Sequence, residues 1–275
     1  MSSTLLMCKP DYFNVDYVIN PWMNGHIHLV DKRLAEEQWQ AFYETLRQYA
    51  TIQLISPKPH LPDLVFTANG GLVYDKLCIL AHFRHKQRQG EEVFFKQWFE
   101  KHGYTVLQMP KSIYFEGTGD ALFQRDGKWV WMGYNIRSEL KACEYLETYL
   151  SMPVTPLKLI NEKFYHLDTC FCPLFDGAVM YYPGAFDADS VQLIEKNIDE
   201  DKRLVVSDED ALHFSCNALV IKTDKIPTKK AVIFMTYASD PLQTQLNQLG
   251  YEVIIRSVSE FRKAGGANKC LVLEV

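Results

Sequence analysis

The chain has 275 residues, of which 47% are hydrophobic and 23% are charged, and its formal net charge is -5. These values are typical of a globular protein with a sizeable core, and they exclude an extensively disordered chain. A mildly acidic chain has no general attraction to nucleic acid or to an anionic membrane surface, so we expect neither as a partner.

Targeting signals and cysteine usage indicate a cytoplasmic protein. The first residues lack the basic start and apolar run of a secretory signal, and no apolar stretch approaches the roughly 20 residues that a membrane span needs. The seven cysteines are odd in number, so we expect reduced thiols rather than a disulfide framework. Cys170 and Cys172 have C-x-C spacing, not the C-x-x-C spacing of a redox or zinc site, and should be buried as small hydrophobic side chains.

Runs typical of β-strands alternate with amphipathic runs typical of helices along the whole chain. In chain order, the predicted elements are a helix over 33–50, a strand over 51–57, a hairpin over 70–83, a helix over 92–102, a strand over 103–110, a hairpin over 120–134, a helix over 138–150, a hairpin over 170–183, a helix over 189–198, a hairpin over 218–234, a helix over 240–249 and a strand over 251–258. Gly127 and Gly177 are expected in hairpin turns. Asp189 and Asp240 are the expected N-caps of their helices.

The order strand pair, helix, strand recurs about five times, which predicts an α/β fold of small modules within one domain over residues 1–275. The modules share no obvious motif, so the repeat is visible only in the order of the elements. Such a chain can close into a ring of modules, and a doubly wound sheet is the alternative. The frequent tight hairpins favour mixed or antiparallel pairing over a purely parallel sheet.

Four polar segments place carboxylates or amides at the edges of apolar strands. The first contains Asp63 and Asn69 around a Leu-Val-Phe run. A buried aspartate without compensation is costly, so Asp63 should meet water or a cationic partner, or cap a strand edge. The second has Glu116 and Asp120 on a glycine-rich turn, which could bind a metal or a guanidinium or could be a capped turn. It lacks the third glycine and the following helix of a dinucleotide-binding motif.

The other two segments supply an imidazole and a thiol. His166 and Asp168 point to the same face if their segment is a strand, and an imidazole beside a carboxylate can act as a general acid or base. Taken alone, such a pair favours a core histidine with a satisfied hydrogen bond. Cys270 follows a Gly-Gly loop and leads an apolar strand, and the adjacent Lys269 could stabilise a thiolate. By itself, this last segment favours a plain terminal strand.

Together and in this order, the four segments resemble those of the guanidino-modifying enzymes of the pentein superfamily. That group includes arginine deiminases, dimethylarginine dimethylaminohydrolases, amidinotransferases and arginine dihydrolases. Stretches along nearly the whole chain are similar to the catalytic domain of the arginine dihydrolases, namely 16–23, 62–69, 88–92, 164–174 and 182–187. Some dihydrolases carry a further C-terminal domain; because this chain stops just after Cys270, we do not expect regulation by such a domain.

The resemblance implies a pentein α/β propeller, in which five ββαβ-like modules surround a pseudo-fivefold axis and the active site lies in the central channel. It implies L-arginine or a relative as the small-molecule substrate, with no metal and no organic cofactor. It also implies a role for each of several residues. These are the nucleophile Cys270, the general acid/base His166, the guanidinium contacts Glu116 and Asp168, the contacts Asp63 and Asn20 to the substrate's amino end, and the contacts Arg88 and Arg137 to its α-carboxylate.

Two further expectations follow from these roles. Glu116 and Asp168 would raise the pKa of Cys270 in the empty site by like-charge repulsion, and a bound guanidinium would oppose that effect. The polar, glycine-containing segment 20–28 could form a lid over the channel, although a plain surface turn is equally compatible. The sequence is also compatible with a homo-oligomer.

Asn69 departs from the deiminase pattern, which places a second aspartate at this position. A neutral amide offers both a donor and an acceptor, so a ureido product could stay bound or rebind. This implies two rounds of hydrolysis, which convert L-arginine to L-ornithine, carbon dioxide and two ammonia. The alternatives are an arginine deiminase or dimethylarginine dimethylaminohydrolase that stops at citrulline, an amidinotransferase, and a non-catalytic binding protein of the same fold.

Overall fold

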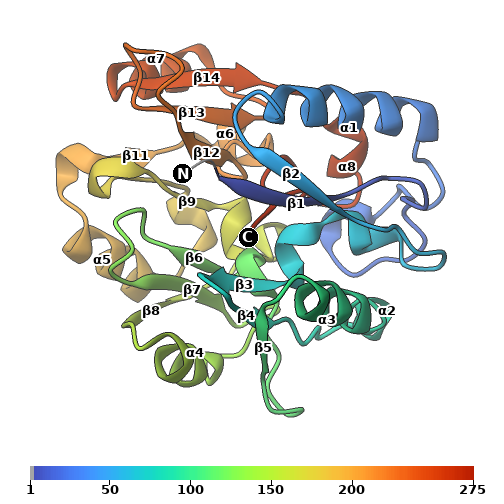
Figure 1. Cartoon of the computed structure of the whole chain (residues 1–275). Helices are drawn as coiled ribbons and strands as arrows, with labels where there is room; N and C mark the ends of the chain where they lie inside the picture. Colours follow the sequence, from blue (N-terminus) through green and yellow to red (C-terminus); the bar gives the residue numbers. More distant parts are fainter. Residues whose placement is uncertain (1–2) are drawn as a thin grey trace.

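Five three-stranded sheets surround the centre of the molecule in the computed structural model, which describes residues 3–275 (Figure 1). The chain visits the sheets in order, as the colours around Figure 1 show. The strands are β1 (Thr4–Cys8), β2 (Thr51–Ile55), β3 (Gly71–Tyr74), β4 (Leu77–Leu80), β5 (Thr105–Gln108), β6 (Ala121–Phe123), β7 (Val130–Tyr134), β8 (Val154–Lys158), β9 (Phe171–Pro173), β10 (Val179–Tyr181), β11 (Arg203–Val205), β12 (Leu219–Lys222), β13 (Ala231–Met235), β14 (Tyr251–Ile255) and β15 (Leu273–Glu274).

The longer helices lie on the outside of this ring of sheets (Figure 1). The α-helices are α1 (Lys32–Leu46), α2 (Lys86–Gln89), α3 (Glu92–Lys101), α4 (Ala142–Leu150), α5 (Ala188–Asn197), α6 (Asp208–Leu212), α7 (Asp240–Gln248) and α8 (Ser259–Arg262). Within residues 3–275, none of them combines the length and the apolar character that crossing a membrane requires.

Each module repeats one arrangement of strands and helix. In the sheet β6-β7-β8, the hairpin β6–β7 is antiparallel, α4 follows, and β8 returns parallel to β7. The sheets β3-β4-β5, β9-β10-β11 and β12-β13-β14 have the same pairing pattern. The prediction of a modular ring with mixed pairing is therefore confirmed. The doubly wound alternative is wrong, because the described strands form five separate sheets rather than one large one.

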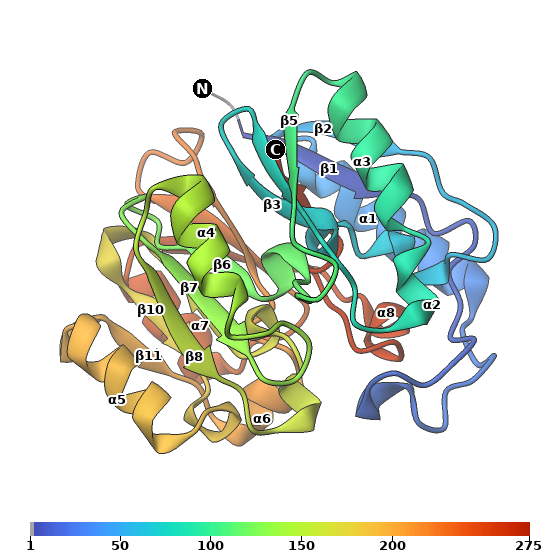
Figure 2. The ribbon, with the colours of Figure 1, turned by 90° about the horizontal axis from the view of Figure 1, so that it is seen from below.

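The first module is completed by the last strand of the chain. Strand β15 pairs antiparallel with β1, placing Leu6 opposite Leu273, and β2 pairs parallel with β1 on its other edge. Figure 2 shows β1 beside the C-terminal segment. The segment that carries Cys270 is thus fixed to the first module of the ring, although it comes from the far end of the sequence.

The central strand of each sheet is apolar on both faces because the sheet packs against two different neighbours. On β7, Val130 and Met132 pack with Leu146 of α4 in one cluster. The intervening Trp131 points to the other face and packs with Phe171 of the next module, with ring centroids 5.2 Å apart. One face therefore holds the module's own helix and the other holds the neighbouring module, which is how burial of apolar surface stabilises the ring.

Two helix caps and three strands differ from the sequence-based expectations. Asp187 caps α5 and Ser239 caps α7, so the predicted caps Asp189 and Asp240 are wrong. Both predicted residues lie in the first turn, where a carboxylate favours the helix dipole, whereas a cap needs extended backbone just outside the helix. Strands β1, β8 and β11 were not predicted; β8 contains a proline, and β11 has only three residues.

Hydrogen bonds between turns, rather than between strands, join the modules around the centre. Each of five turns lies just before the strand that opens a sheet: Thr67–Gly70 before β3, Gly117–Gly119 before β6, Leu167–Thr169 before β9, 215–217 before β12 and 268–270 before β15. Five bonds link successive turns: Thr118 Oγ1 to Ala68 O (2.6 Å), Leu167 N to Asp120 Oδ1 (3.1 Å), Asn217 Nδ2 to Asp168 O (3.1 Å), Lys269 N to Asn217 O (3.2 Å) and Ala68 N to Cys270 O (3.2 Å). The side chains of these turns therefore converge.

Candidate active site

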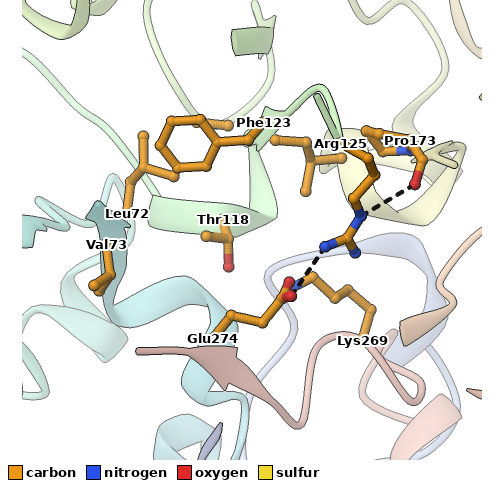
Figure 3. A pocket seen from close by; sticks show the side chains of 10 residues that line it. Leu72, Val73, Thr118, Phe123, Arg125, Pro173, Lys269 and Glu274 are labelled. Carbon is orange, nitrogen blue, oxygen red and sulfur yellow. Dashed lines mark hydrogen bonds and ion pairs between the residues drawn. The ribbon is translucent and has the colours of Figure 1, made fainter. Parts of the chain in front are cut away.

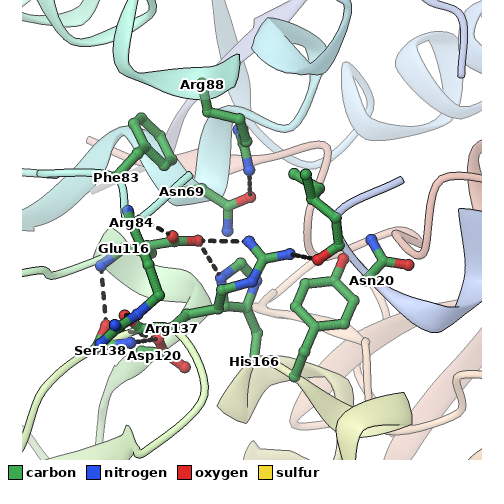
Figure 4. Close-up of polar contacts among 12 residues, drawn as sticks. Asn20, Asn69, Phe83, Arg84, Arg88, Glu116, Asp120, Arg137, Ser138 and His166 are labelled. Carbon is green, nitrogen blue, oxygen red and sulfur yellow. Dashed lines mark hydrogen bonds and ion pairs between the residues drawn. The ribbon is translucent and has the colours of Figure 1, made fainter. Parts of the chain in front are cut away.

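Glu116 and His166 form the centre of a buried polar cluster (Figure 4). His166 Nε2 lies 2.7 Å from Glu116 Oε2, and Arg137 Nη1 donates to the same oxygen at 2.9 Å. The other carboxylate oxygen accepts the backbone N–H of Arg84 at 3.1 Å. Burial would raise the pKa of Glu116, but the Arg137 guanidinium and the His166 imidazole outweigh this and hold the pKa well below its usual range. Glu116 is therefore a carboxylate in the empty site.

The third segment folds as a turn, and this changes the partner of His166. Leu167–Thr169 is a 3₁₀ turn, so the expectation that His166 and Asp168 share one face of a strand is wrong. His166 pairs with Glu116 instead, and Asp168 pairs with Cys270. Each pair joins two different modules, so its geometry depends on the ring and not on spacing along the chain.

The Cys270 thiol lies in a buried turn between Asp168 and Asn217. The thiol donates to Asp168 Oδ2 at 3.4 Å, and Asn217 Nδ2 donates to Sγ at 3.1 Å. Strand β15 begins only at Leu273, so the expectation that Cys270 leads the strand is wrong. Within residues 3–275, Cys270 has no hydrogen bond with His166.

Burial and a neighbouring carboxylate together disfavour the thiolate in the empty site. Burial raises the pKa of Cys270 well above its usual value, and the charge of Asp168 raises it further. The Glu116 carboxylate is paired with Arg137 and His166, and the carboxylate with the largest effect on the thiol is Asp168. Burial also raises the pKa of Asp168 to about 7, against the opposing effect of Lys269.

Lys269, which the sequence suggested as a cation beside the thiolate, pairs with Glu274. Its ammonium lies 3.7 Å from Glu274 and reaches a cavity of about 130 Å³ that Arg125 also lines (Figure 3). Arg125 in turn donates to Glu274 at 2.9 Å. The charge of Lys269 lowers the pKa of Asp168, which burial raises.

Arg88 and Glu91 hold the first segment through a buried ion pair. Arg88 donates to both oxygens of Glu91 at 2.8 Å, to Asn69 Oδ1 at 2.8 Å and to the backbone oxygen of Asp63 at 3.1 Å. Its Nε also lies 3.9 Å from Asp63 Oδ2, which accepts from Tyr17 at 2.8 Å. Asp63 thus has the cationic partner that its burial required. Burial raises its pKa, and Arg88 opposes that shift.

Within residues 3–275, three buried polar atoms of the expected site residues have no hydrogen-bond partner. They are Asp63 Oδ1, Asp168 Oδ1 and Asn69 Nδ2. The amide nitrogen of Asn69 faces the same point as His166, because a Cβ at Gly119 would overlap Asn69 Nδ2 and would lie 3.0 Å from His166 Nδ1. Buried polar groups normally have hydrogen-bond partners. The two unpartnered acceptors and one unpartnered donor therefore indicate where a ligand would place its own donors and acceptor.

Arg137 has more N–H groups available to a ligand than Arg88 has. Arg137 uses Nη1 for Glu116 and Nη2 for the backbone oxygen of Ile19, and its guanidinium stacks on Tyr165 at 4.5 Å. Three of its five N–H groups remain free, whereas Arg88 already makes four hydrogen bonds. Figure 4 shows Arg137 and Asn69 directed toward the same central region.

Asn20 and the predicted lid segment are anchored to the surrounding structure. Asn20 Oδ1 caps the short helix Pro21–Met23, and its amide donates to the backbone oxygen of Ala264 at 3.0 Å. Trp22 Nε1 donates to the backbone oxygen of Lys163 at 2.7 Å, so the segment bridges two modules at the mouth of the site. These bonds support a structural role for the Asn20 side chain beside any contact with a substrate.

Sequence reasoning found most of the converging side chains but missed three. Asn217, Glu91 and Tyr165 received no role, although Glu91 and Tyr165 lie inside stretches that carried the resemblance. A ring of five modules requires five central turns, so the turn before β12 could have been sought in the sequence. Within residues 3–275, no group of three or more His, Cys, Asp or Glu side chains is arranged to hold a metal ion.

The negative charge of Asp168 should slow alkylation of the Cys270 thiol, and this effect can be measured. Replacing Asp168 with asparagine should lower the pKa of Cys270, because the neighbouring negative charge that disfavours the thiolate is removed. Alkylation of Cys270 by iodoacetamide at pH 8 should then be several-fold faster than in the wild-type protein. Mass spectrometry of the Cys270 peptide across a pH series measures this. Slower or unchanged alkylation would contradict the proposed pairing.

Comparisons with known proteins identify relatives of the chain. The family model described as N,N dimethylarginine dimethylhydrolase, eukaryotic, matches residues 10–275. The chain is 49% identical, over 98% of its length, to the bifunctional arginine dihydrolase/ornithine cyclodeaminase AgrE of Nostoc sp., of which it covers 37%. It is 34% identical to the N(G),N(G)-dimethylarginine dimethylaminohydrolase of Mycobacterium tuberculosis, over 98% of this chain and 84% of that protein. The chain thus spans less than half the length of relatives such as AgrE.

A solved structure shows the same fold. The N-terminal domain of the cyanobacterial arginine dihydrolase ArgZ, in a cysteine-to-serine variant bound to substrate, superposes with a TM-score of 0.95 at 47% identity. The match covers 99% of this chain and 98% of that domain. The five-module pentein architecture is therefore confirmed, and the chain belongs to the dimethylarginine dimethylaminohydrolase family of pentein proteins, together with the arginine dihydrolase domains of AgrE and ArgZ.

Proposed function

We propose that the chain hydrolyses the guanidino group of free L-arginine to L-ornithine, carbon dioxide and two ammonia. The observation that carries this proposal is the orientation of the Asn69 amide. Arg88 donates to Asn69 Oδ1, so the oxygen is occupied and the unpartnered Nδ2 faces the site. A guanidinium has no acceptor for this donor, whereas the carbonyl oxygen of a ureido group does. The carboxylates of Glu116 and Asp168 suit a guanidinium, and the Asn69 donor suits a ureido oxygen, so we infer that the site accepts both arginine and citrulline.

The polar groups that face the channel match the two ends of arginine. The free oxygen of Asp168 and the carboxylate of Glu116 would hold the guanidinium by charge-assisted hydrogen bonds beside Cys270. At the far end, the free oxygen of Asp63 would accept from the α-ammonium, and Arg137 would donate to the α-carboxylate. Arg88 would contribute there chiefly by holding Asn69 and the backbone of Asp63.

The first half-reaction releases one ammonia. The bound guanidinium favours ionisation of the Cys270 thiol, which releases its proton to water. The thiolate then attacks the guanidino carbon, and protonated His166 donates a proton to the departing nitrogen as the C–N bond breaks. This leaves a thiouronium bound to the sulfur. A water molecule then gives a proton to His166 and attacks the same carbon. The C–S bond breaks, the thiolate leaves, and citrulline remains in the channel.

The second half-reaction repeats these steps on citrulline. Asn69 Nδ2 would donate to the ureido oxygen, where negative charge develops when the thiolate adds. A second ammonia leaves with a proton from His166, giving a thiocarbamate on Cys270. Water cleaves the C–S bond and releases a carbamate, which decomposes to ornithine and carbon dioxide. A variant of the ArgZ domain has been captured covalently bound to a reaction intermediate, which is consistent with such a route.

Product analysis tests the proposal and separates it from its main rival. Incubation with L-arginine should give ornithine and two ammonia per arginine consumed, measured by mass spectrometry and an ammonia assay. Citrulline that accumulates with one ammonia would instead support a deiminase. Dimethylarginine is the matched second substrate, because the family model carries that activity in its description. Faster release of an alkylamine from dimethylarginine than of ammonia from arginine would overturn the substrate assignment.

Asn69 should control whether the reaction proceeds past citrulline. An Asn69→Asp variant loses the N–H donor and gains a charge that favours a guanidinium over a neutral ureido group. We expect citrulline hydrolysis to fall by about tenfold or more, the effect of one charge-stabilising hydrogen bond, while arginine is still converted to citrulline. Asn135→Asp is the control, because Asn135 is exposed and donates to the backbone of Leu159 away from the site. An unchanged ratio of ornithine to citrulline in Asn69→Asp would argue against this role.

A further inference from the structure

Asn217 occupies the one central turn to which the proposed chemistry assigns no residue. The turns before β3, β6, β9 and β15 supply or adjoin Asn69, Glu116, Asp168 and Cys270. The turn 215–217 before β12 is the fifth, and its asparagine is completely buried. A buried amide must be satisfied within the protein, so its partners show what the fifth turn contributes.

The side chain of Asn217 binds both the thiol and the backbone of the proposed nucleophile. Its Nδ2 lies 3.1 Å from Cys270 Sγ and 3.1 Å from the backbone oxygen of Asp168. Its Oδ1 accepts the backbone N–H of Cys270 at 3.2 Å. The backbone oxygen of Asn217 also accepts from Lys269 N at 3.2 Å. One residue thus connects the turn that carries the thiol with the turn that carries its neighbouring carboxylate.

The orientation of this amide is determined by its partners. The backbone N–H of Cys270 can only donate, and the backbone oxygen of Asp168 can only accept, so the amide oxygen must face Cys270 N and the nitrogen must face Asp168 O. Rotating the amide by 180° would place its nitrogen against the Cys270 N–H, so that two donors face each other. It would also place its oxygen against the Asp168 oxygen, so that two acceptors face each other. The second hydrogen of Nδ2 is therefore held toward Sγ, where it can donate to a thiolate.

We propose that Asn217 is a further catalytic residue, which donates a hydrogen bond to the Cys270 thiolate and fixes the direction of its sulfur. This proposal rests on the proposed function, because it takes Cys270 as the nucleophile. The need for such a donor is clear from the surroundings. The thiol is buried beside Asp168, and both effects disfavour its ionised form, whereas the hydrogen bond from Asn217 favours it. An uncharged donor stabilises the thiolate without competing with a cationic substrate for the carboxylates.

The test measures alkylation of Cys270 directly, so it does not depend on turnover. Wild-type protein, Asn217→Ala and Asn217→Asp are treated with iodoacetamide between pH 6 and pH 10, and the Cys270 peptide is quantified by mass spectrometry. Loss of the donor should slow alkylation at pH 8 by about tenfold in Asn217→Ala, the effect of one hydrogen bond to a charged group. Asn217→Asp should be slower still, because it has the same shape but places a negative charge beside the sulfur. In both variants kcat for arginine should fall more than KM rises.

Asn268→Ala is the matched control. Asn268 is also completely buried in the turn that carries Cys270, but its amide donates to the backbone oxygen of Arg256 at 3.0 Å. Within residues 3–275, it makes no hydrogen bond with the thiol. Its removal should lower thermal stability while the pH profile of alkylation stays that of the wild type. The isosteric Asn217→Asp keeps the test valid if Asn217→Ala fails to fold.

The outcomes separate this proposal from the proposed function. Wild-type alkylation profiles in both Asn217 variants, with normal kcat, would overturn the role of Asn217. Equal slowing in Asn268→Ala would also overturn it, because a general loosening of the turn would then account for the effect. If wild-type protein releases no ammonia from arginine but the Asn217 variants still slow alkylation, the proposed substrate fails while the link between Asn217 and the thiol stands.

Discussion

Replacing Cys270 with alanine is expected to abolish ammonia release from arginine, with a loss on the order of 10⁴-fold or more in kcat. The reason is chemical, because both proposed half-reactions pass through a bond from carbon to this sulfur. The side chain is small and its backbone N–H keeps its bond to Asn217 in the variant, so the fold should persist. A coupled ammonia assay and intact-mass spectrometry of stalled protein measure the effect.

Cys143→Ala is the matched control for the loss of a buried thiol. Cys143 lies in α4, where its thiol contacts Met132 Sδ at 3.4 Å, and it packs in the cluster around that helix. Like all seven cysteines it is free and buried. Its removal should cost modest stability by leaving a small cavity, with kcat unchanged. A Cys270→Ala protein that still releases ammonia at the wild-type rate would disprove the assignment of the nucleophile.

Removing Glu91 is expected to be the most destabilising single change of a polar side chain. Glu91 and Arg88 are 0% and 3% exposed, and they are joined by two hydrogen bonds of 2.8 Å. Glu91→Ala leaves the Arg88 guanidinium buried without its charge partner, which typically costs about 3–5 kcal/mol. Urea denaturation followed by circular dichroism measures the free energy of unfolding.

Glu44→Ala is the control for this ion pair. Glu44 and Arg47 have the same spacing of three residues, but both are more than half exposed and their closest atoms are 3.3 Å apart. An exposed pair contributes about 0–1 kcal/mol, so this variant should be close to wild type. Equal losses of stability in Glu91→Ala and Glu44→Ala would contradict the importance of burial.

A double variant separates the structural role of the Arg88–Glu91 pair from its role in the site. Arg88→Met combined with Glu91→Leu replaces both charges with apolar side chains of similar size, which is often neutral for stability. Asn69 would then lose the donor that orients its amide. We expect only partial recovery of stability, because buried Asp63 also loses Arg88 as its cationic partner. Hydrolysis of citrulline should be impaired, because that step is assigned to the N–H of Asn69.

The sequence by itself determined the repeated order of strands and helices, and it determined which types of polar side chain lie at the centre of the ring. Hairpins such as 120–134 and helices such as 138–150 depend on local patterns of apolar residues and turns, and these patterns persist in the fold. Asp63, Asn69 and Cys270 stood out because polar groups interrupt apolar runs. Local signals of this kind do not require knowledge of the neighbours of a segment in space.

Only the tertiary structure decided which of these groups meet. His166 was expected to pair with Asp168, two residues away, but its partner is Glu116, 50 residues away, while Asp168 meets Cys270, 102 residues away. Lys269 is adjacent to the thiol in sequence, yet its side chain extends to Glu274. Such pairs join different modules, so spacing along the chain does not constrain them. Asn217 remained unnoticed for the same reason, because a single asparagine gains meaning only when ring closure places it against a thiol from another module.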